Sequence, residues 1–278
     1  MFSPSRAQGP LSRALLPAYV GRPFPRMTVV TGYFDDSRNG NIVAIAGYMS
    51  ALDHWDGMFA PTWAAFVDDP SWPSPMGEFK TADCRGGYGK FASWPREERD
   101  RCFRRAVEII GTSFPAGDIF GIGIALELPQ SWDQGIRERF LFFAYMTCLG
   151  HVINNVLHLC EYALIDPKSE IQFILDDQPK WKGDAWEMFE GAVRLAGRDP
   201  QDFEKPMFRN SERLPPLQAA DLLAYETSKE VKKRRDDPSQ KVRGALEALE
   251  LVSKPSLGRL RGKSSSLQRG GDAHRADG

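Results

Sequence analysis

The chain has 278 residues, of which 42% are hydrophobic and 26% are charged, which is ordinary globular composition for one large domain or two small ones. Its formal net charge of -1 hides an asymmetry: residues 1–34 carry +4, residues 229–278 carry +6, and the body between them carries -11. An acidic body favours cation binding and repels free nucleic acid. The basic ends are typical either of solvated tails or of segments that touch phosphates.

The cysteines and the apolar segments indicate a cytoplasmic protein that does not span a membrane. No CxxC spacing occurs, and the four cysteines lie in or near apolar helical stretches: Cys84, Cys102, Cys148 and Cys160. We therefore predict reduced, buried thiols. No uninterrupted apolar run reaches the ~18 residues that a membrane span needs.

The two ends of the chain differ in composition from its middle. Residues 1–26 are rich in Arg, Pro and Ser, which resembles a transit peptide, but prolines break any amphipathic helix there. We predict a disordered leader over 1–26, with Met27 as a natural start. A single domain is predicted over 27–252 and a disordered basic tail over 253–278.

The hydrophobic pattern predicts a hairpin followed by strands that alternate with helices. The predicted strands cover 28–35, 41–49, 119–128, 171–176 and 205–209. The predicted helices cover 55–67, 95–112, 134–164, 184–195, 215–235 and, as a short element, 240–252. Residues 68–77 and 86–93 are expected to be loops, and 78–83 an extended or mixed segment. This order predicts an α/β fold with a mixed β-sheet flanked by helices.

Three separated aspartates are the strongest functional signal. Asp35 and Asp176 each end an apolar run, and Asp221 lies inside the apolar helical segment 217–224. Ligands gather at the carboxyl ends of strands in such sheets. Buried carboxylates that converge repel each other and call for a cation. The sequence therefore predicts a divalent-metal site built from two strands and one helix, and its oxygen ligands select Mg²⁺ or Mn²⁺.

The order of elements and acids resembles an RNase H-like fold, and three segments resemble the domain-of-unknown-function family numbered 3800. Tyr33-Phe34-Asp35-Asp36-Ser37 stands in place of a strand ending in Tyr-x-Asp-Glu-Ser. Leu217–Ala224 matches Leu-Gln-x-Ala-Asp-Leu-Leu-Ala closely, and 173–177 matches a strand ending in Asp. The resemblance covers about residues 28–235, and the departures are Asp36 for Glu and Lys80 in a segment where many members carry His.

The resemblance implies a phosphodiesterase in which carboxylates hold two divalent metals. Asp35, Asp176 and Asp221 would be the ligands, with Asp35 as the bridge and Glu78 as a weaker fourth catalytic carboxylate. Gln218 and Tyr225 lie three residues before and four residues after Asp221, so they share its helix face and are candidates to orient ligands or substrate. Lys80 is a further candidate for substrate binding.

Each candidate also has a purely structural interpretation. Asp221 could cap a helix or pair with an arginine, Asp35 could open the hairpin, and Asp176 could cap the following turn. Glu78 is more typical of a structural residue than of a ligand. The basic run at 229–235 could hold phosphates, although cations also complement a helix C-terminus.

Other candidates carry weaker signals. His151 and His158 lie about 10 Å apart along one helix, too far to hold one metal readily. Trp181 and Trp186 follow Asp176 and could stack on bases. We predict a metal-dependent nuclease or nucleic-acid-processing phosphodiesterase. The alternatives are a non-catalytic binding module with the same fold and a hydrolase for a small phosphorylated substrate.

Overall fold

The computed structural model describes residues 29–115, 118–161, 165, 169–177, 182–195, 197–237, 239–246 and 249. The predicted leader and basic tail lie outside these residues, so both remain predictions. The short helix predicted at 240–252 falls partly outside them, and residues 244–246 and 249 are helical.

A five-stranded mixed sheet forms the centre of the domain. Its strands are β1 (Val29–Asn39), β2 (Ile42–Ala51), β3 (Ile119–Glu127), β4 (Glu170–Asp176) and β5 (Met207–Arg209). They are ordered β3-β2-β1-β4-β5, and β2 is antiparallel to both of its neighbours while β1, β4 and β5 run parallel. This mixed sheet with flanking helices is the predicted α/β architecture, and its RNase H-like character stays a prediction.

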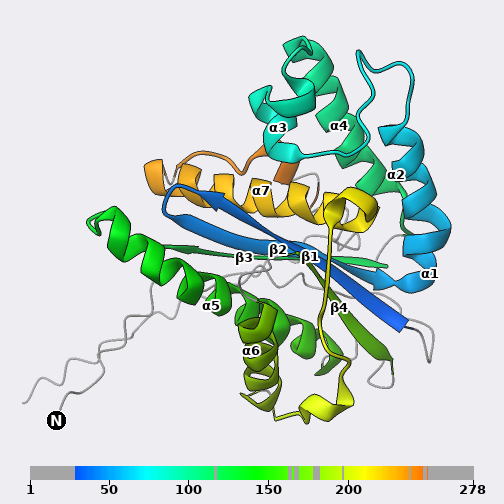
Figure 1. Ribbon diagram of the computed structural model, residues 1–278. Coiled ribbons are helices and arrows are strands. Elements are labelled where there is room, and N and C mark those ends of the chain that lie inside the picture. The colour runs from blue at the N-terminus through cyan, green and yellow to red at the C-terminus, as the bar shows by residue number, and fades with distance from the viewer. Residues whose placement is uncertain are drawn as a thin grey trace, which may run out of the picture.

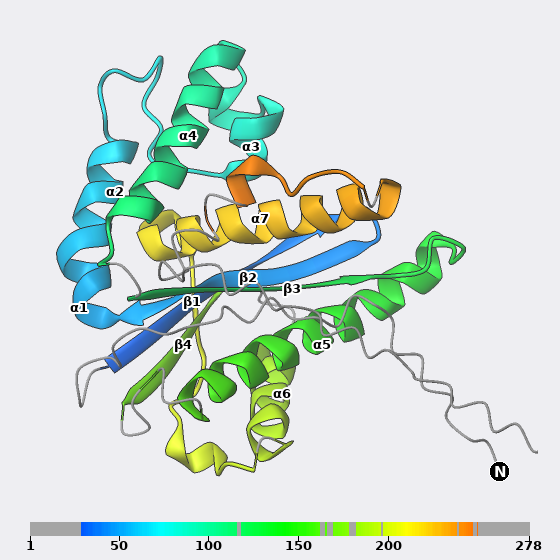
Figure 2. The same cartoon turned by 180° about the vertical axis from the view of Figure 1, so that it is seen from behind.

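Helices cover both faces of the sheet (Figures 1 and 2). The α-helices are α1 (Leu52–His54), α2 (Ala60–Val67), α3 (Thr81–Gly86), α4 (Arg96–Thr112), α5 (Gln134–Glu161), α6 (Lys182–Leu195) and α7 (Pro215–Asp236). Shorter turns are the π-helical η1 (Trp55–Phe59) and the 3-10 turns η2 (Gly89–Phe91), η3 (Pro200–Asp202) and η4 (Ser211–Arg213). Helices α5 and α6 lie on one face, and α7 lies on the other, beneath the α1–α4 region (Figure 1).

Alternation along β1 separates two hydrophobic cores. Phe34 points into the core that α5 and α6 cover, where Phe173 and Phe189 also lie. Tyr33 points into the core on the α7 side, which continues outward to Trp55 and Trp63. Because successive side chains of a strand point to opposite faces, every second residue of β1 faces α7.

Strand β1 is longer than the sequence predicts. The apolar run ends at Phe34, but pairing with β2 continues from Asp35–Ala46 to Asn39–Ile42, and Gly40 turns the chain at a φ of +65°. Asp35 therefore lies inside the strand and does not end it, which corrects the prediction. Its parallel neighbour β4 does end there, since the last β1–β4 pair is Phe34–Leu175.

Two other segments also differ from their predictions. Residues 81–83, predicted as extended or mixed, begin helix α3 at Thr81, and the preceding Lys80 is extended. The helix predicted over 55–67 begins with a π-helical turn, and Pro61 lies directly after that turn, near the start of α2.

Helix α5 is long and apolar enough to cross a membrane by length and composition alone, although polar residues interrupt its apolar run. Within the described residues, 134–159 is the stretch that passes this test, and more than half of it is buried inside the structure. The helix packs on β2, β3 and α6. Its first half leaves Ile136, Phe140 and Phe143 exposed.

The close approach of β2 to β1 leaves no room for a side chain at Gly47. A Cβ atom there would lie 1.8 Å from the Tyr33 carbonyl oxygen and 2.7 Å from the Phe34 Cα atom. We expect Gly47→Ala to lower the free energy of unfolding by about 3 kcal/mol, measured by urea denaturation. Gly57→Ala is the control, because nothing lies within 4 Å of its Cβ position and alanine favours a helix. A Gly47→Ala protein as stable as Gly57→Ala would contradict this packing.

Candidate functional site

The register of the sheet places Asp35 and Asp176 side by side. Phe34 pairs with Leu175 in the parallel ladder, so Asp35 and Asp176 occupy the next position on each strand. Both follow residues of the α7-side core, Tyr33 and Ile174, by two positions, so both face α7. The sequence predicted this meeting of two strand positions correctly, although only β4 ends there.

Helix α7 brings Asp221 to the same face. The helix packs along β1 and β2, and Leu217 and Leu222 are fully buried. Asp221 accepts a 2.7 Å hydrogen bond at its Oδ2 atom from the Thr81 amide at the start of α3. No arginine of the described residues pairs with it. The contact with Thr81 anchors the α3 segment to α7.

The three carboxylates influence one another electrostatically. Burial raises the pKa of Asp35 well above its usual range, and the charges of Asp221, Asp176 and Asp36 raise it further. Burial also raises the pKa of Asp221, although the Thr81 amide and the Lys80 charge oppose the shift. Asp35 is only 7% exposed, and the hydrogen bond that the described residues donate to its carboxylate comes from the adjacent Asp36 amide, at 2.7 Å. Asp35 is thus a buried acid with little internal compensation.

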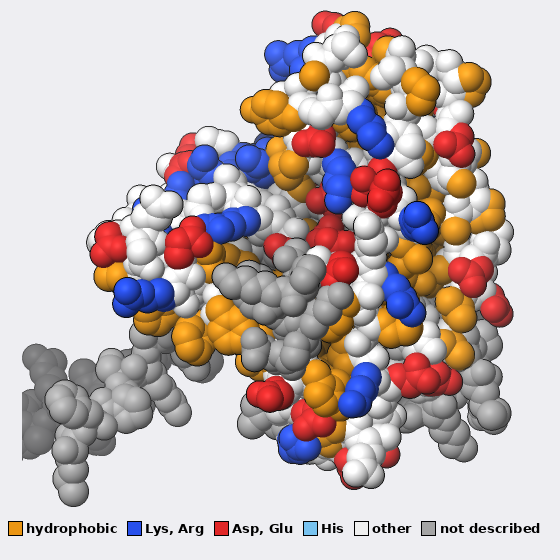
Figure 3. Space-filling model, in the orientation of Figure 1, with side chains coloured by type: hydrophobic (Ala, Val, Ile, Leu, Met, Phe, Trp, Pro, Cys, Tyr) orange, Lys and Arg blue, Asp and Glu red, His pale blue; other side chains and the backbone are white. Residues whose placement is uncertain are grey.

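Glu78 and Lys80 lie beside these aspartates. The Lys80 Nζ atom is 3.2 Å from Glu78 Oε1 and 3.0 Å from Ser211 Oγ. Ser211 also donates from Oγ to Glu78 at 3.1 Å and from its backbone amide to Asp176 Oδ1 at 3.2 Å. Burial alone would lower the pKa of Lys80, but the charges of Glu78, Asp221 and Asp35 raise it. In the view of Figure 3, acidic side chains gather near the centre of the surface, with basic side chains beside them.

Gln218 fastens the segment that carries Glu78 and Lys80. Its Oε1 atom accepts hydrogen bonds from Trp63 Nε1 at 2.9 Å and from the Phe79 amide at 3.0 Å. Its Nε2 atom donates to the Ser211 carbonyl at 3.0 Å. Gln218 is 3% exposed, so in this structure it positions the site from within, and a direct contact with substrate stays a prediction.

Tyr225 and the basic end of α7 extend away from the carboxylates. Lys229 lies over the Tyr225 ring at 5.2 Å. Arg234 pairs with Glu230 at 2.7 Å and Arg235 with Glu127 at 2.9 Å, and Lys233 donates to the Lys241 carbonyl. Most of this cluster is engaged within the fold, as expected for a structural helix end.

The described residues contain no group of three or more His, Cys, Asp or Glu side chains placed to hold a metal ion. The aspartates face one another without forming a coordination shell. Their oxygen donors suit Mg²⁺ or Mn²⁺ chemically, but side chains must move for one ion to contact all of them. The assignment of Asp35, Asp176, Asp221 and Glu78 as ligands or catalytic groups remains a prediction.

The remaining candidates lie elsewhere. His151 is exposed on α5, across the sheet from Asp221. Trp186 packs on Phe189, and Trp181 lies outside the described residues. Cys84, Cys102 and Cys148 are free and buried, as predicted.

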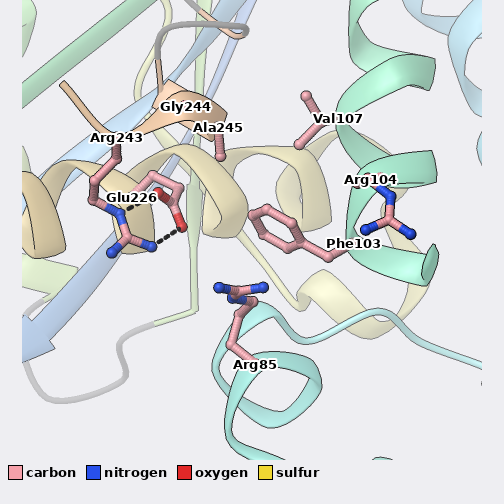
Figure 4. A pocket seen from close by; sticks show the side chains of 8 residues that line it. All are labelled: Arg85, Phe103, Arg104, Val107, Glu226, Arg243, Gly244 and Ala245. Atoms are coloured by element: carbon pink, nitrogen blue, oxygen red, sulfur yellow. Dashed lines mark hydrogen bonds and ion pairs between the residues drawn. The ribbon is translucent and has the colours of Figure 1, made fainter. Parts of the chain in front are cut away.

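A cavity of about 430 Å³ lies further along α7. Figure 4 shows its lining: Arg85, Phe103, Arg104, Val107, Glu226, Arg243, Gly244 and Ala245. Arg243 donates to Glu226 from Nε at 2.7 Å and from Nη2 at 3.0 Å, and the Glu226 side chain is fully buried. Local sequence patterns do not indicate this pair, because it joins α7 to a segment beyond the helix.

Comparison with known proteins adds little to this geometry. No protein-family model and no curated protein matches the chain. Among solved structures, a chain in the structure of the PCNA:RNase HII complex from Archaeoglobus fulgidus is similar over 84% of this chain and 96% of that chain, with 13% sequence identity and a TM-score of 0.38. A likeness at this level carries no argument about activity, so the function must be argued from the site.

The buried charge of Asp35 makes a prediction about stability. Because the folded protein holds this proton more tightly than the unfolded chain, stability falls as pH rises from about 4 through the folded-state pKa. We expect Asp35→Asn, measured by urea denaturation with a chelator, to raise the free energy of unfolding by about 1–2 kcal/mol at pH 8. The gain should vanish near pH 4, where the carboxyl is neutral in both states. A gain independent of pH would show that the charge of Asp35 is not the cause.

At the Arg243–Glu226 pair, removing a charge should lower the free energy of unfolding instead of raising it. Arg243→Met leaves the buried Glu226 carboxylate without its partner and should cost about 3–5 kcal/mol in urea denaturation. The double variant Arg243→Met with Glu226→Gln should recover part of this loss. Arg105→Met, which breaks an exposed pair with Glu108, is the control and should cost less than about 1 kcal/mol. Equal losses for the two arginine variants would contradict the argument.

Proposed function

We propose that this protein is a Mg²⁺- or Mn²⁺-dependent phosphodiesterase that cleaves nucleic acid and belongs to the domain-of-unknown-function family numbered 3800. The observation that carries the proposal is the meeting of three carboxylates from separate elements: Asp35 on β1, Asp176 at the end of β4 and Asp221 on α7. Fold stability alone gives no reason to bury repelling acids together.

The donor set fits a hard divalent cation better than a soft one. All candidate ligands offer carboxylate oxygens, and the free cysteines Cys84, Cys102 and Cys148 lie buried in the hydrophobic cores. Asp35 is central because the charges of both other aspartates act on it and raise its pKa. A bound cation would relieve the repulsion and keep Asp35 ionised at neutral pH.

The site residues would have three roles: metal binding, positioning and substrate contact. Asp35, Asp176 and Asp221 would hold the metal ions, which when bound activate water and neutralise the phosphate charge. Gln218 and Ser211 fix the backbone on either side of the site. Lys80, beside the carboxylates, and Tyr225, one helical turn beyond Asp221 on α7, would contact the substrate.

A second function, that of a non-catalytic binding module, is favoured by one observation. The described residues hold no ready-made group of three metal-binding side chains. A protein of this kind would bind its partner without consuming it, and neither metal nor the aspartates would be required.

The test is a calorimetric Mn²⁺ titration of the wild type beside Asp35→Asn and Asp221→Asn. We expect saturable binding in the wild type and a loss of affinity of about 100-fold or more in each variant, since each change removes a direct ligand. Asp118→Asn is the control, because this aspartate precedes β3 and pairs loosely with His54 at 3.8 Å. It should bind like the wild type.

The same proteins should then be assayed on DNA, RNA and hybrid strands with Mg²⁺, Mn²⁺ or a chelator. Metal-dependent cleavage that both aspartate variants lose supports the proposal. Cleavage of small phosphate esters alone would assign a small substrate. Metal-independent binding of a strand without cleavage would favour the binding module.

A further inference from the structure

Lys80 is the cation that the described residues place among the carboxylates. Its ammonium contacts Glu78 at 3.2 Å, and its charge acts on both Asp221 and Asp35. The nearest basic residue by strand register, Arg209, pairs with Asp176 through the backbone of β5, but its guanidinium turns to the Met207 sulfur at 3.6 Å. The positive charge at the site therefore comes mainly from Lys80.

Hydrogen bonds fix the backbone on both sides of Lys80, whereas its side chain is partly exposed to solvent. The preceding Phe79 amide donates to Gln218 and the following Thr81 amide donates to Asp221. The Lys80 side chain itself is 44% exposed. A lysine stem is long and flexible, so its ammonium can leave the carboxylates without any change in the backbone.

We infer that Lys80 is the resident cation of the carboxylate site and that a divalent metal must displace its ammonium in order to bind. This inference rests on the proposed function, because it concerns a side chain that would compete with the metal at the same site. Lys80 occupies part of the charge balance that a metal would otherwise supply, which accounts for aspartates that face one another without a coordination shell.

The consequence is competition between two cations for one set of oxygens. Removing the ammonium should make the site more negative and leave room for the metal. Lys80→Met keeps the length and apolar stem of the side chain and removes its charge, whereas Lys80→Arg keeps the charge. Lys229→Met is the matched control, because this lysine lies on α7 over Tyr225 instead of among the carboxylates.

The experiment is calorimetric Mn²⁺ titration of the wild type and these three variants without substrate, after circular dichroism and thermal melting confirm that each is folded. We expect Lys80→Met to bind Mn²⁺ about tenfold more tightly than the wild type, while Lys80→Arg and Lys229→Met bind like the wild type. Tighter binding by Lys229→Met as well would reduce the effect to general charge and overturn the inference.

Three other outcomes bear on this inference and on the proposed function together. Equal or weaker Mn²⁺ binding by folded Lys80→Met, with clear binding by the wild type, overturns the role of Lys80 and leaves the metal site standing. No binding by either protein overturns both, because a site freed of its resident cation should accept a metal. Binding by Lys80→Met alone supports both.

Discussion

The packing of α7 along β1 and β2 is the constraint on which the site depends. The helix buries Leu217 and Leu222 against the sheet and so fixes the depth and rotation of Asp221 between them. Strand β1 presents Asp35 to the same interface, because the alternation that buries Tyr33 under α7 also directs Asp35 there. One hydrophobic contact therefore determines where two acids meet, and neither acid can leave without disturbing the core.

Hydrogen bonds of Gln218 link this interface to the two segments that carry the other site residues. Gln218 lies one helical turn before Asp221 and holds the backbone at Phe79 and at Ser211. The first contact positions Lys80 and Thr81, and the second positions the hydroxyl and amide that reach Glu78 and Asp176. A single buried amide thus sets the relative positions of three segments that lie far apart in sequence. This makes Gln218 a positioning residue whatever chemistry the site performs.

Local patterns predicted the parts of this arrangement that depend on one element at a time. Apolar runs and helical spacing placed the strands, α7 and the acids, and the alternation of a sheet was enough to bring Asp35 near Asp176. The rest depends on long-range contacts. The extension of β1 past Asp35 is imposed by pairing with β2, and the start of α3 at Thr81 coincides with its contact to Asp221. Nothing near Lys80 in the sequence indicates that Ser211 will meet it.

Two buried acids on α7 differ in how far the rest of the chain compensates their charge. Glu226 is fully enclosed, and Arg243 satisfies both of its oxygens with a planar pair of hydrogen bonds. Among the described residues, Asp221 receives one backbone amide and the more distant charge of Lys80, while Asp35 receives its neighbour's amide and a weaker influence of the same lysine. The same helix that provides a complete partner for one acid leaves the other acid and its β1 neighbour short of positive charge. Because burying charge without compensation is costly, the incompletely compensated pair is the one that the proposed metal ions would stabilise.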